Sequence, residues 1–279
     1  MKVAFWSNAS EMCRVSANLA AISVACAIRS SYSIISMENH LCNHNLGKAY
    51  KGGARVNLLD EVGNNYYDGS GFEGLLRKIY RGAIQPSLLK SYLMEIINMH
   101  LYYIPQSRII HNEIFDYELG HCIEPLFHMI EANSDLCLID TASNNNLSTK
   151  IILEEADLIV VNLCQKSSVV EDFFLNYSSL ISKAVFIISH YNPHSLYNLK
   201  HISSLYNIPS EFIIPIPDNE RYDSAYRNGC VHEFVSRNIN CIKENPNFLF
   251  IQSIKKASHI VLKKVDLIAK QKEIILCGR

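Results

Sequence analysis

Short apolar runs recur along the chain, separated by longer stretches in which apolar residues follow helical spacing. The clearest runs lie in the second half, at 135–140 (DLCLID), 158–162 (LIVVN), 184–189 (AVFIIS) and 212–216 (FIIPI). Such runs are typical of strands buried on both faces, as in a parallel sheet covered by helices. Val3–Trp6 and Ser33–Ser36 predict two earlier strands, and LYYIP at 101–105 is a further strand candidate.

Helical spacing predicts helices over about 13–28, Phe72–Tyr80, Asp116–Ala132 and 247–270. Pro86 opens another predicted helix, whose apolar residues recur as far as Ile97, and polar residues 37–71 are expected to form a loop. The alternation predicts an α/β fold, with a three-layer, doubly wound and mostly parallel sheet and helices on both faces. Without a break in composition, we expect one domain over 1–279, with a helical insert around 70–132 and a C-terminal helix.

The composition is that of an ordinary globular protein, with a formal net charge of −1 over 279 residues. Acidic residues are spread among the basic ones, so nucleic acid is not an expected partner. Nine scattered cysteines without a CxxC pair indicate reduced thiols, and we expect a cytoplasmic protein. Residues 15–28 follow a strand and lack a basic leader, so they do not predict a signal peptide. A peripheral position at the inner membrane face is the alternative location.

The segment SNASEMC at 7–13 joins the first predicted strand to a helix, where a phosphate-binding loop would begin. Such loops use glycines that let backbone N–H groups converge, a lysine, and a hydroxyl for Mg²⁺. Here the glycines and the lysine are missing, and the helix N-terminus contributes only about 1–2 kcal/mol. The Glu11 carboxylate at ~4 Å from a phosphate would cost about 4 kcal/mol at an effective dielectric constant of 20. Tight triphosphate binding and hydrolysis are therefore not expected.

The N-terminal segment resembles the ParA/MinD superfamily of deviant Walker ATPases, and within it the CpaE/TadZ-like proteins linked to pilus assembly. The family pattern KGGVGKTTTAVNLAAALA aligns without gaps with SNASEMCRVSANLAAISV, anchored by Asn18 to Ala21. The signature lysine of the family falls on Ser7, its phosphate-binding lysine on Met12 and its Mg²⁺-binding threonine on Cys13. The family glycines fall on Asn8, Ala9 and Glu11. The packing positions persist while the chemical positions have changed.

The similarity continues downstream. DLCLIDTASNNNL at 135–147 is similar to the family switch segment hhhIDxPP, with Asp140 on the acidic position. FIIPIPDNERYDSAYRNG at 212–229 is similar to IPxDxxxxxAxxxG, with Pro217 matching, and residues 70–93 resemble the insert of TadZ-like chains. The resemblance implies a P-loop NTPase-like fold with a degenerate nucleotide site. The residues of that site are Ser7, Asn8, Ser10, Glu11, Met12, Cys13, Arg14, Asp140 and Pro217.

The resemblance further implies a non-catalytic scaffold that positions or assembles a cellular apparatus through protein contacts. We expect no catalytic residue and no resident cofactor, and a homodimer across the face of the 7–12 loop that does not need ATP. One alternative is an ATPase that binds ATP and Mg²⁺ atypically through Arg14 and Asp140. Otherwise Arg14 is a solvated helix residue and Asp140 caps a turn. A second alternative is a membrane-surface protein that uses the C-terminal helix, which otherwise covers the core.

Two clusters in the sequence combine residue types that ligate metals. His40, Cys42 and His44 alternate in HLCNH, a spacing that fits no standard zinc pattern and predicts a polar loop. Glu124 and His128 share one face of a predicted helix, but a di-metal carboxylate site would need a partner helix with the same motif. The sequence therefore predicts no metal site.

Overall fold

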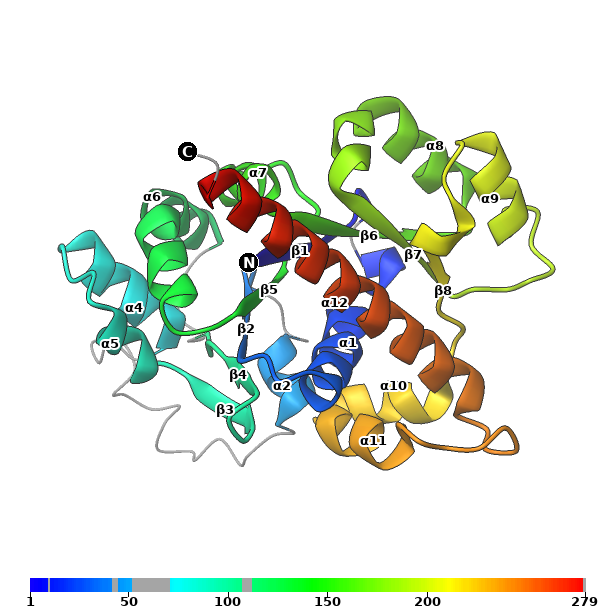
Figure 1. The fold of residues 1–279 in the computed structure, drawn as a ribbon, viewed down its shortest axis with the longest axis horizontal. Coiled ribbons are helices and arrows are strands. Elements are labelled where there is room, and N and C mark those ends of the chain that lie inside the picture. The colour runs from blue at the N-terminus through cyan, green and yellow to red at the C-terminus, as the bar shows by residue number, and fades with distance from the viewer. Residues whose placement is uncertain (10, 42–44, 52–70, 107–111, 278–279) are drawn as a thin grey trace.

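A computed structural model describes residues 1–9, 11–41, 45–51, 71–106 and 112–277. Within these residues eight strands form one sheet in the order β3-β4-β2-β5-β1-β6-β7-β8, parallel except for the antiparallel edge strand β3 (Figure 1). The strands are β1 (Lys2–Trp6), β2 (Ile34–Glu38), β3 (Met94–Ile97), β4 (Leu101–Tyr103), β5 (Leu136–Asp140), β6 (Leu158–Cys164), β7 (Ala184–Ser189) and β8 (Ile213–Pro215). The expected mostly parallel sheet is confirmed.

Helices cover both faces of this sheet, which gives the expected three layers. One face carries α1 (Val15–Arg29), α2 (Leu46–Tyr50), α10 (Glu220–Arg227), α11 (Val231–Asn238) and α12 (Phe248–Cys277). The other carries α4 (Gly71–Tyr80), α5 (Pro86–Lys90), α6 (Asn112–Glu131), α7 (Leu147–Glu155), α8 (Ser167–Asn176) and α9 (Leu199–Leu205). Each face of the sheet thereby has its own apolar core.

Strand β1 lies between β5 and β6 and contributes side chains to both cores. Val3 and Phe5 face the α1 side, whereas Ala4 and Trp6 face the α8 side, as the two-residue period of a strand requires. The ring of Trp6 lies 4.9 Å from that of Tyr177. The segment after β1 consequently begins at the carboxyl edge of the sheet, where ligands bind in open α/β folds.

Two local predictions from the sequence are wrong. A short helix, α2, forms inside 37–71, where a loop was expected; the Asn45 side chain caps it by accepting from the Lys48 N–H. The helix that opens at Pro86 ends at Lys90, and residues 94–97 form β3 instead of continuing it. Met94 pairs with Tyr103 in the antiparallel ladder between β3 and β4, so the backbone groups of this run bond to β4 instead of to a further helical turn. A short apolar run is compatible with both the helical and the strand period, so the pairing with β4 determined that residues 94–97 form a strand.

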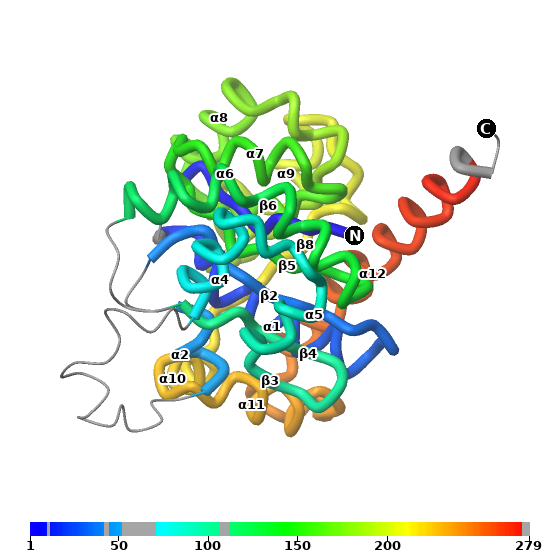
Figure 2. Tube along the Cα trace, turned by 90° about the vertical axis from the view of Figure 1, so that its left-hand side faces the viewer, coloured from blue at the N-terminus to red at the C-terminus, as the bar shows by residue number. Residues whose placement is uncertain are grey.

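The C-terminal helix α12 packs on the sheet through a stripe at helical spacing, formed by the buried residues Ile254, Ala257, Val261 and Val265. The Lys264 ammonium lies 3.9 Å from the centroid of the Phe212 ring, so a lysine of this helix also packs against the rest of the protein. The helix still contacts the body at Lys272, whose ammonium lies 2.6 Å from Asp157, and its last turns extend away from the rest of the molecule (Figure 2). None of the helices in the described part of the chain is both long and apolar enough to cross a membrane.

Replacement of Ile254 tests this packing. Ile254→Ala should lower the free energy of unfolding by about 2–5 kcal/mol, because it opens a cavity under α12. Leu249→Ala, on the same helix but 67% exposed, should change it by less than about 0.5 kcal/mol. Urea unfolding followed by circular dichroism measures both. Equal effects would mean that α12 is not docked as described.

Candidate functional site

The first two side chains of the loop that follows β1 make hydrogen bonds inside the protein. Ser7 is fully buried, and its hydroxyl donates to the Ala9 carbonyl (3.2 Å) and accepts from the Ala9 N–H (3.1 Å). The Asn8 amide donates to the Val169 carbonyl (2.9 Å) and to Asp172 of α8 (2.7 Å). Ser7 therefore stabilises the turn of the loop, Asn8 joins the loop to α8, and the short Ser7 side chain does not reach the surface.

The second half of the loop is a 3-10 turn, η1 (Glu11–Cys13). Cys13 is fully buried in the α8-side core, where it contributes packing rather than a ligand to a surface site. Met12 is 44% exposed, and the Lys166 ammonium lies 3.2 Å from its sulfur. Ser10 and the side chain of Glu11 lie outside the described residues, so the predicted repulsion by Glu11 stays a prediction.

A buried hydrogen-bond network holds the end of this loop. The Cys13 carbonyl accepts from the Ser189 hydroxyl (2.7 Å) and from the Asn18 amide (3.5 Å). The same Asn18 amide donates to Asn162 (2.8 Å) and to Ser189 (2.9 Å). The four residues belong to η1, α1, β6 and β7, so the network joins the loop to the central strands.

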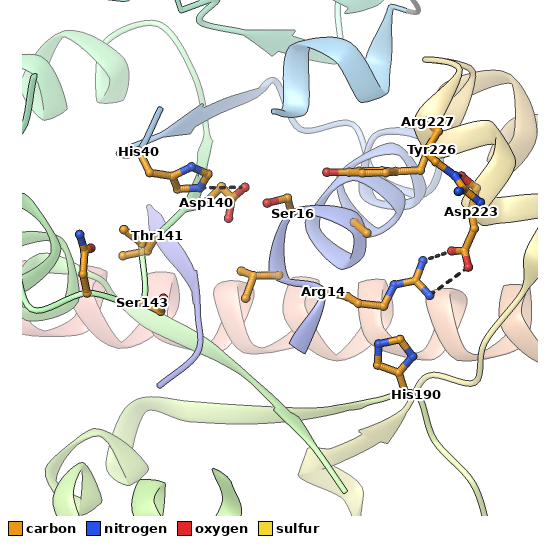
Figure 3. Close-up of a pocket in the computed structure, with 14 residues that line it drawn as sticks. Arg14, Ser16, His40, Asp140, Thr141, Ser143, His190, Asp223, Tyr226 and Arg227 are labelled. Atoms are coloured by element: carbon orange, nitrogen blue, oxygen red, sulfur yellow. Dashed lines mark hydrogen bonds and ion pairs between the residues drawn. The ribbon is translucent and has the colours of Figure 1, made fainter. Parts of the chain in front are cut away.

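Arg14 connects the loop to α1 in a strained conformation. Its φ is 53° and its ψ 38°, in the left-handed region, and its side chain makes no hydrogen bond that caps the helix. The guanidinium forms ion pairs with Asp218 (3.1 Å) and with Asp223 of α10 (Figure 3). His190, also at a φ of 53°, lies with Nδ1 2.6 Å from the same Asp218 carboxylate. Arg14 is thus neither solvated nor free to replace a lost lysine.

Helix α10 is itself held against α1. The buried hydroxyl of Tyr222 donates to the Ala17 carbonyl in the first turn of α1. Asp223 follows directly, which explains why an acid of α10 meets Arg14. Pro217, predicted from the resemblance, follows β8, is half-buried and immediately precedes Asp218.

Asp140 ends β5, beside β1 on one side and β2 on the other. The residue is 1% exposed, and neither of its carboxylate oxygens has a hydrogen-bond partner among the described residues. His40 Nε2 lies 3.3 Å from Oδ2 of Asp140, a contact drawn in Figure 3. The two oxygens therefore depend on this single ion-pair contact, and the expected turn-capping hydrogen bonds do not form.

A second carboxylate, that of Glu38, is fully buried nearby at the end of β2. It accepts from the Tyr103 hydroxyl and from the Leu46 N–H (3.3 Å). Burial raises the pKa of Glu38 to about 7. Burial opposes charge on His40, yet the Asp140 carboxylate raises the pKa of that imidazole to about 9. The electrostatic field between these groups consequently favours positive charge.

Asp140 and His40, but not Glu38, border a cavity of about 820 Å³ at the carboxyl edge of the sheet, beside the N-terminus of α1. Asp140 and His40 lie on one side of it, and Arg14, Asp223 and Arg227 on the other (Figure 3). The cavity is lined by Arg14, Val15, Ser16, Ala17, His40, Asp140, Thr141, Ala142, Ser143, Asn144, His190, Asp223, Tyr226 and Arg227. Of the predicted site residues, Arg14 and Asp140 are brought together here, whereas Ser7, Asn8, Met12, Cys13 and Pro217 are not in the lining.

Sequence reasoning missed most of this lining. His40 was interpreted as part of a polar loop with Cys42 and His44, which lie outside the described residues. His190 follows β7, and the carboxyl ends of parallel strands meet at one edge, so its position carried a usable signal. Asp223, Tyr226 and Arg227 belong to α10, whose contact with α1 no local pattern indicates. Glu124 and His128 border a separate, smaller hollow with Lys2 and Glu155.

Solved structures of other proteins share the fold of this chain. No model of a protein family matches the chain, and no curated protein matches its sequence. The structure of a ParA family ATPase from Chlorobium tepidum TLS is similar, with a TM-score of 0.68 and 14% identity over 92% of this chain and 98% of that one. MinD from Pyrococcus horikoshii OT3, complexed with Mg-ADP, gives a TM-score of 0.64 and 14% identity over 94% and 98% of the two chains.

The MinC:MinD cell division complex of Aquifex aeolicus gives a TM-score of 0.62 and 14% identity, over 94% of this chain and 95% of that one. Because identities are this low, the likeness concerns the fold: the chain has the α/β fold of ParA and MinD ATPases. The P-loop NTPase-like architecture expected from the sequence is confirmed.

Replacing Arg14 tests the left-handed conformation. Arg14→Gly and Arg14→Ala lose the same ion pairs, but only alanine retains a Cβ that is unfavourable at positive φ. The glycine variant should therefore be more stable than the alanine variant by about 1 kcal/mol in urea unfolding. An alanine variant as stable as the glycine variant would contradict the backbone assignment.

Asn18 tests the buried network. Asn18→Ala removes donors from Asn162 and Ser189, and it should destabilise the protein by about 1–3 kcal/mol because buried acceptors lose their partners. The exposed Asn145→Ala, as control, should stay within about 0.5 kcal/mol of the parent. Thermal unfolding of both variants gives the comparison, and indistinguishable midpoints would refute the role of the network.

Proposed function

We propose that this chain is a degenerate member of the ParA/MinD superfamily, nearest its CpaE/TadZ-like group, and that it acts as a non-catalytic scaffold. In this role it positions or assembles a cellular apparatus, such as a pilus or secretion machine, through protein contacts. The observation that carries the proposal is the burial of Ser7 and Cys13, on which the resemblance places the signature lysine and the Mg²⁺-binding threonine. Their side chains serve the core instead of a ligand.

The charges at the cavity support the same conclusion. Arg14 is already neutralised by Asp218 and Asp223, so little of its charge is left for a polyphosphate. Asp140 presents a buried carboxylate whose contact within the described residues is the ion pair with His40. A phosphate at ~4 Å from that carboxylate costs about 4 kcal/mol per charge pair at an effective dielectric constant of 20. Triphosphate binding in the usual pose therefore lacks the lysine charge and the threonine hydroxyl that the family loop supplies.

We further propose that two copies associate across the face that carries the 7–12 loop, without nucleotide. In the family that the chain resembles, the signature lysine reaches across this face to the nucleotide of the partner copy. Ser7 cannot do so, because its side chain is short and buried and bonds to Ala9. Met12 is the large apolar side chain that the loop exposes, and it would be covered in such a dimer. The likeness to the MinC:MinD complex supports a protein partner for this fold.

Sedimentation and calorimetry test the proposal together. Titration with Mg-ATP should give no binding heat up to millimolar nucleotide, and the sedimenting mass should be that of a dimer with or without Mg-ATP. Met12→Asp should convert the dimer to a monomer, because it places a charge in the contact, while Leu249→Asp, exposed on α12, should not. Micromolar ATP binding or an ATP-dependent mass would favour the rival, an ATPase with atypical ligands.

A further inference from the structure

We propose that Glu38, His40 and Asp140 form a binding site for one divalent first-row transition-metal ion, held by protein side chains alone. One ligand atom from each residue can be chosen so that all three lie within 4.8 Å of one another. The inference does not rest on the scaffold function, because it concerns the donor atoms of these three side chains.

The sheet itself brings the ligands together. Glu38 and Asp140 end the neighbouring parallel strands β2 and β5, and they are direct partners in the register of that pair. His40 follows two residues after Glu38, so its side chain returns to the same strand edge. The Gln106 amide donates to the His40 carbonyl (2.7 Å) and to the Glu38 carbonyl (3.3 Å), which holds the backbone between the two ligands.

The distances suit a common ion. His40 Nε2 and Asp140 Oδ2 are 3.3 Å apart, close to the roughly 3.4 Å that separates two ligands at about 2.0–2.1 Å from a tetrahedral ion. Both Asp140 oxygens are buried and accept no hydrogen bond from the described residues, an arrangement that native proteins rarely keep without a purpose. Apart from its ion pair with His40, this carboxylate is therefore available to an ion, and it lines the cavity.

Two hydrogen-bond donors orient the Glu38 carboxylate. Its two oxygens accept from the Tyr103 hydroxyl and from the Leu46 N–H, and each retains a further lone pair for an ion. Metal-ligating carboxylates typically have such outer partners, which fix their direction. Once an ion has displaced the imidazole proton, the two buried carboxylates and the neutral imidazole carry a charge of about −2, which a divalent cation balances.

The donor types select the class of ion. Imidazole favours zinc and other first-row transition ions, whereas Mg²⁺ and Ca²⁺ prefer oxygen ligands throughout. His40 and Asp140 line the cavity, so ions enter from that side and retain open coordination positions towards it. Cys13, on which the resemblance places the Mg²⁺-binding threonine, is not among the three ligands. The site therefore differs from a nucleotide-bound magnesium site.

Cobalt is a suitable probe, because its absorption separates nitrogen and oxygen ligands from thiolates. The full-length chain, freed of metal with a chelator, is titrated with Co²⁺ at pH 8, where the imidazole proton is more readily displaced. We expect one Co²⁺ per chain, weak visible ligand-field bands, and no strong near-ultraviolet thiolate band despite nine cysteines. Zn²⁺ should displace the Co²⁺, and millimolar Mg²⁺ should not.

Variants assign the ligands. His40→Ala and Asp140→Asn should each weaken Co²⁺ binding at least tenfold, whereas His190→Ala, in the same cavity, should leave it unchanged. Circular dichroism establishes that each variant is folded. If Asp140→Asn does not fold, the thermal midpoint provides the second measurement, since Zn²⁺ should raise it in the parent and not in His40→Ala.

Three outcomes would overturn the site: no Co²⁺ bound at millimolar concentration, a spectrum dominated by thiolate ligands, or an affinity that His40→Ala and Asp140→Asn leave intact. The Mg-ATP titration and the sedimentation experiment are run on metal-free protein, in buffer freed of transition-metal ions and without chelator, so that Mg²⁺ stays on the nucleotide. Their results therefore report on the scaffold proposal separately, and either proposal can fail while the other stands.

Discussion

The carbonyl oxygen of Cys13 is the point on which the carboxyl edge of the sheet depends. Asn18 and Ser189 donate to it, and Asn162 completes the buried set. These bonds join the loop after β1 to the two strands beside it, inside a region from which water is excluded. A buried polar network that is fully paired specifies one conformation, because each lost partner costs a desolvated group. The loop can therefore keep its path without the glycines that such loops otherwise use.

This anchoring determines which side chains reach the cavity. The side chains of Ser7 and Cys13 are buried. Arg14 has a left-handed backbone conformation, and its guanidinium forms an ion pair with α10. His190 adopts the same unusual φ over the same Asp218 carboxylate. Strained backbone persists where surrounding contacts over-determine it, and such residues gather at functional sites. Two such residues line this cavity, which supports its choice as the candidate site.

The structural likeness and the chemistry of the site lead to different conclusions. At 14% identity the sheet order and helical layers still follow a ParA family ATPase over nearly the whole chain. A fold is maintained by packing, which many sequences satisfy, whereas a function depends on particular groups at particular positions. In this chain the wall opposite Arg14 carries an imidazole between two buried carboxylates, a set of donors that suits a cation better than a polyphosphate.

Local pattern alone determined much of this protein. The buried strands of the second half, helices α1, α4 and α6, and the absence of glycine and lysine from residues 7–13 are readable from neighbouring residues. The pattern failed at 94–97, where an apolar run fits two periods and pairing with β4 selected the strand. It could not place Arg14 against Asp223, or His40 against Asp140, since these partners lie far apart in sequence. Their meeting depends on how β2 registers on β5 and how α10 docks on α1. Those contacts form only when the whole sheet and its helical layers assemble.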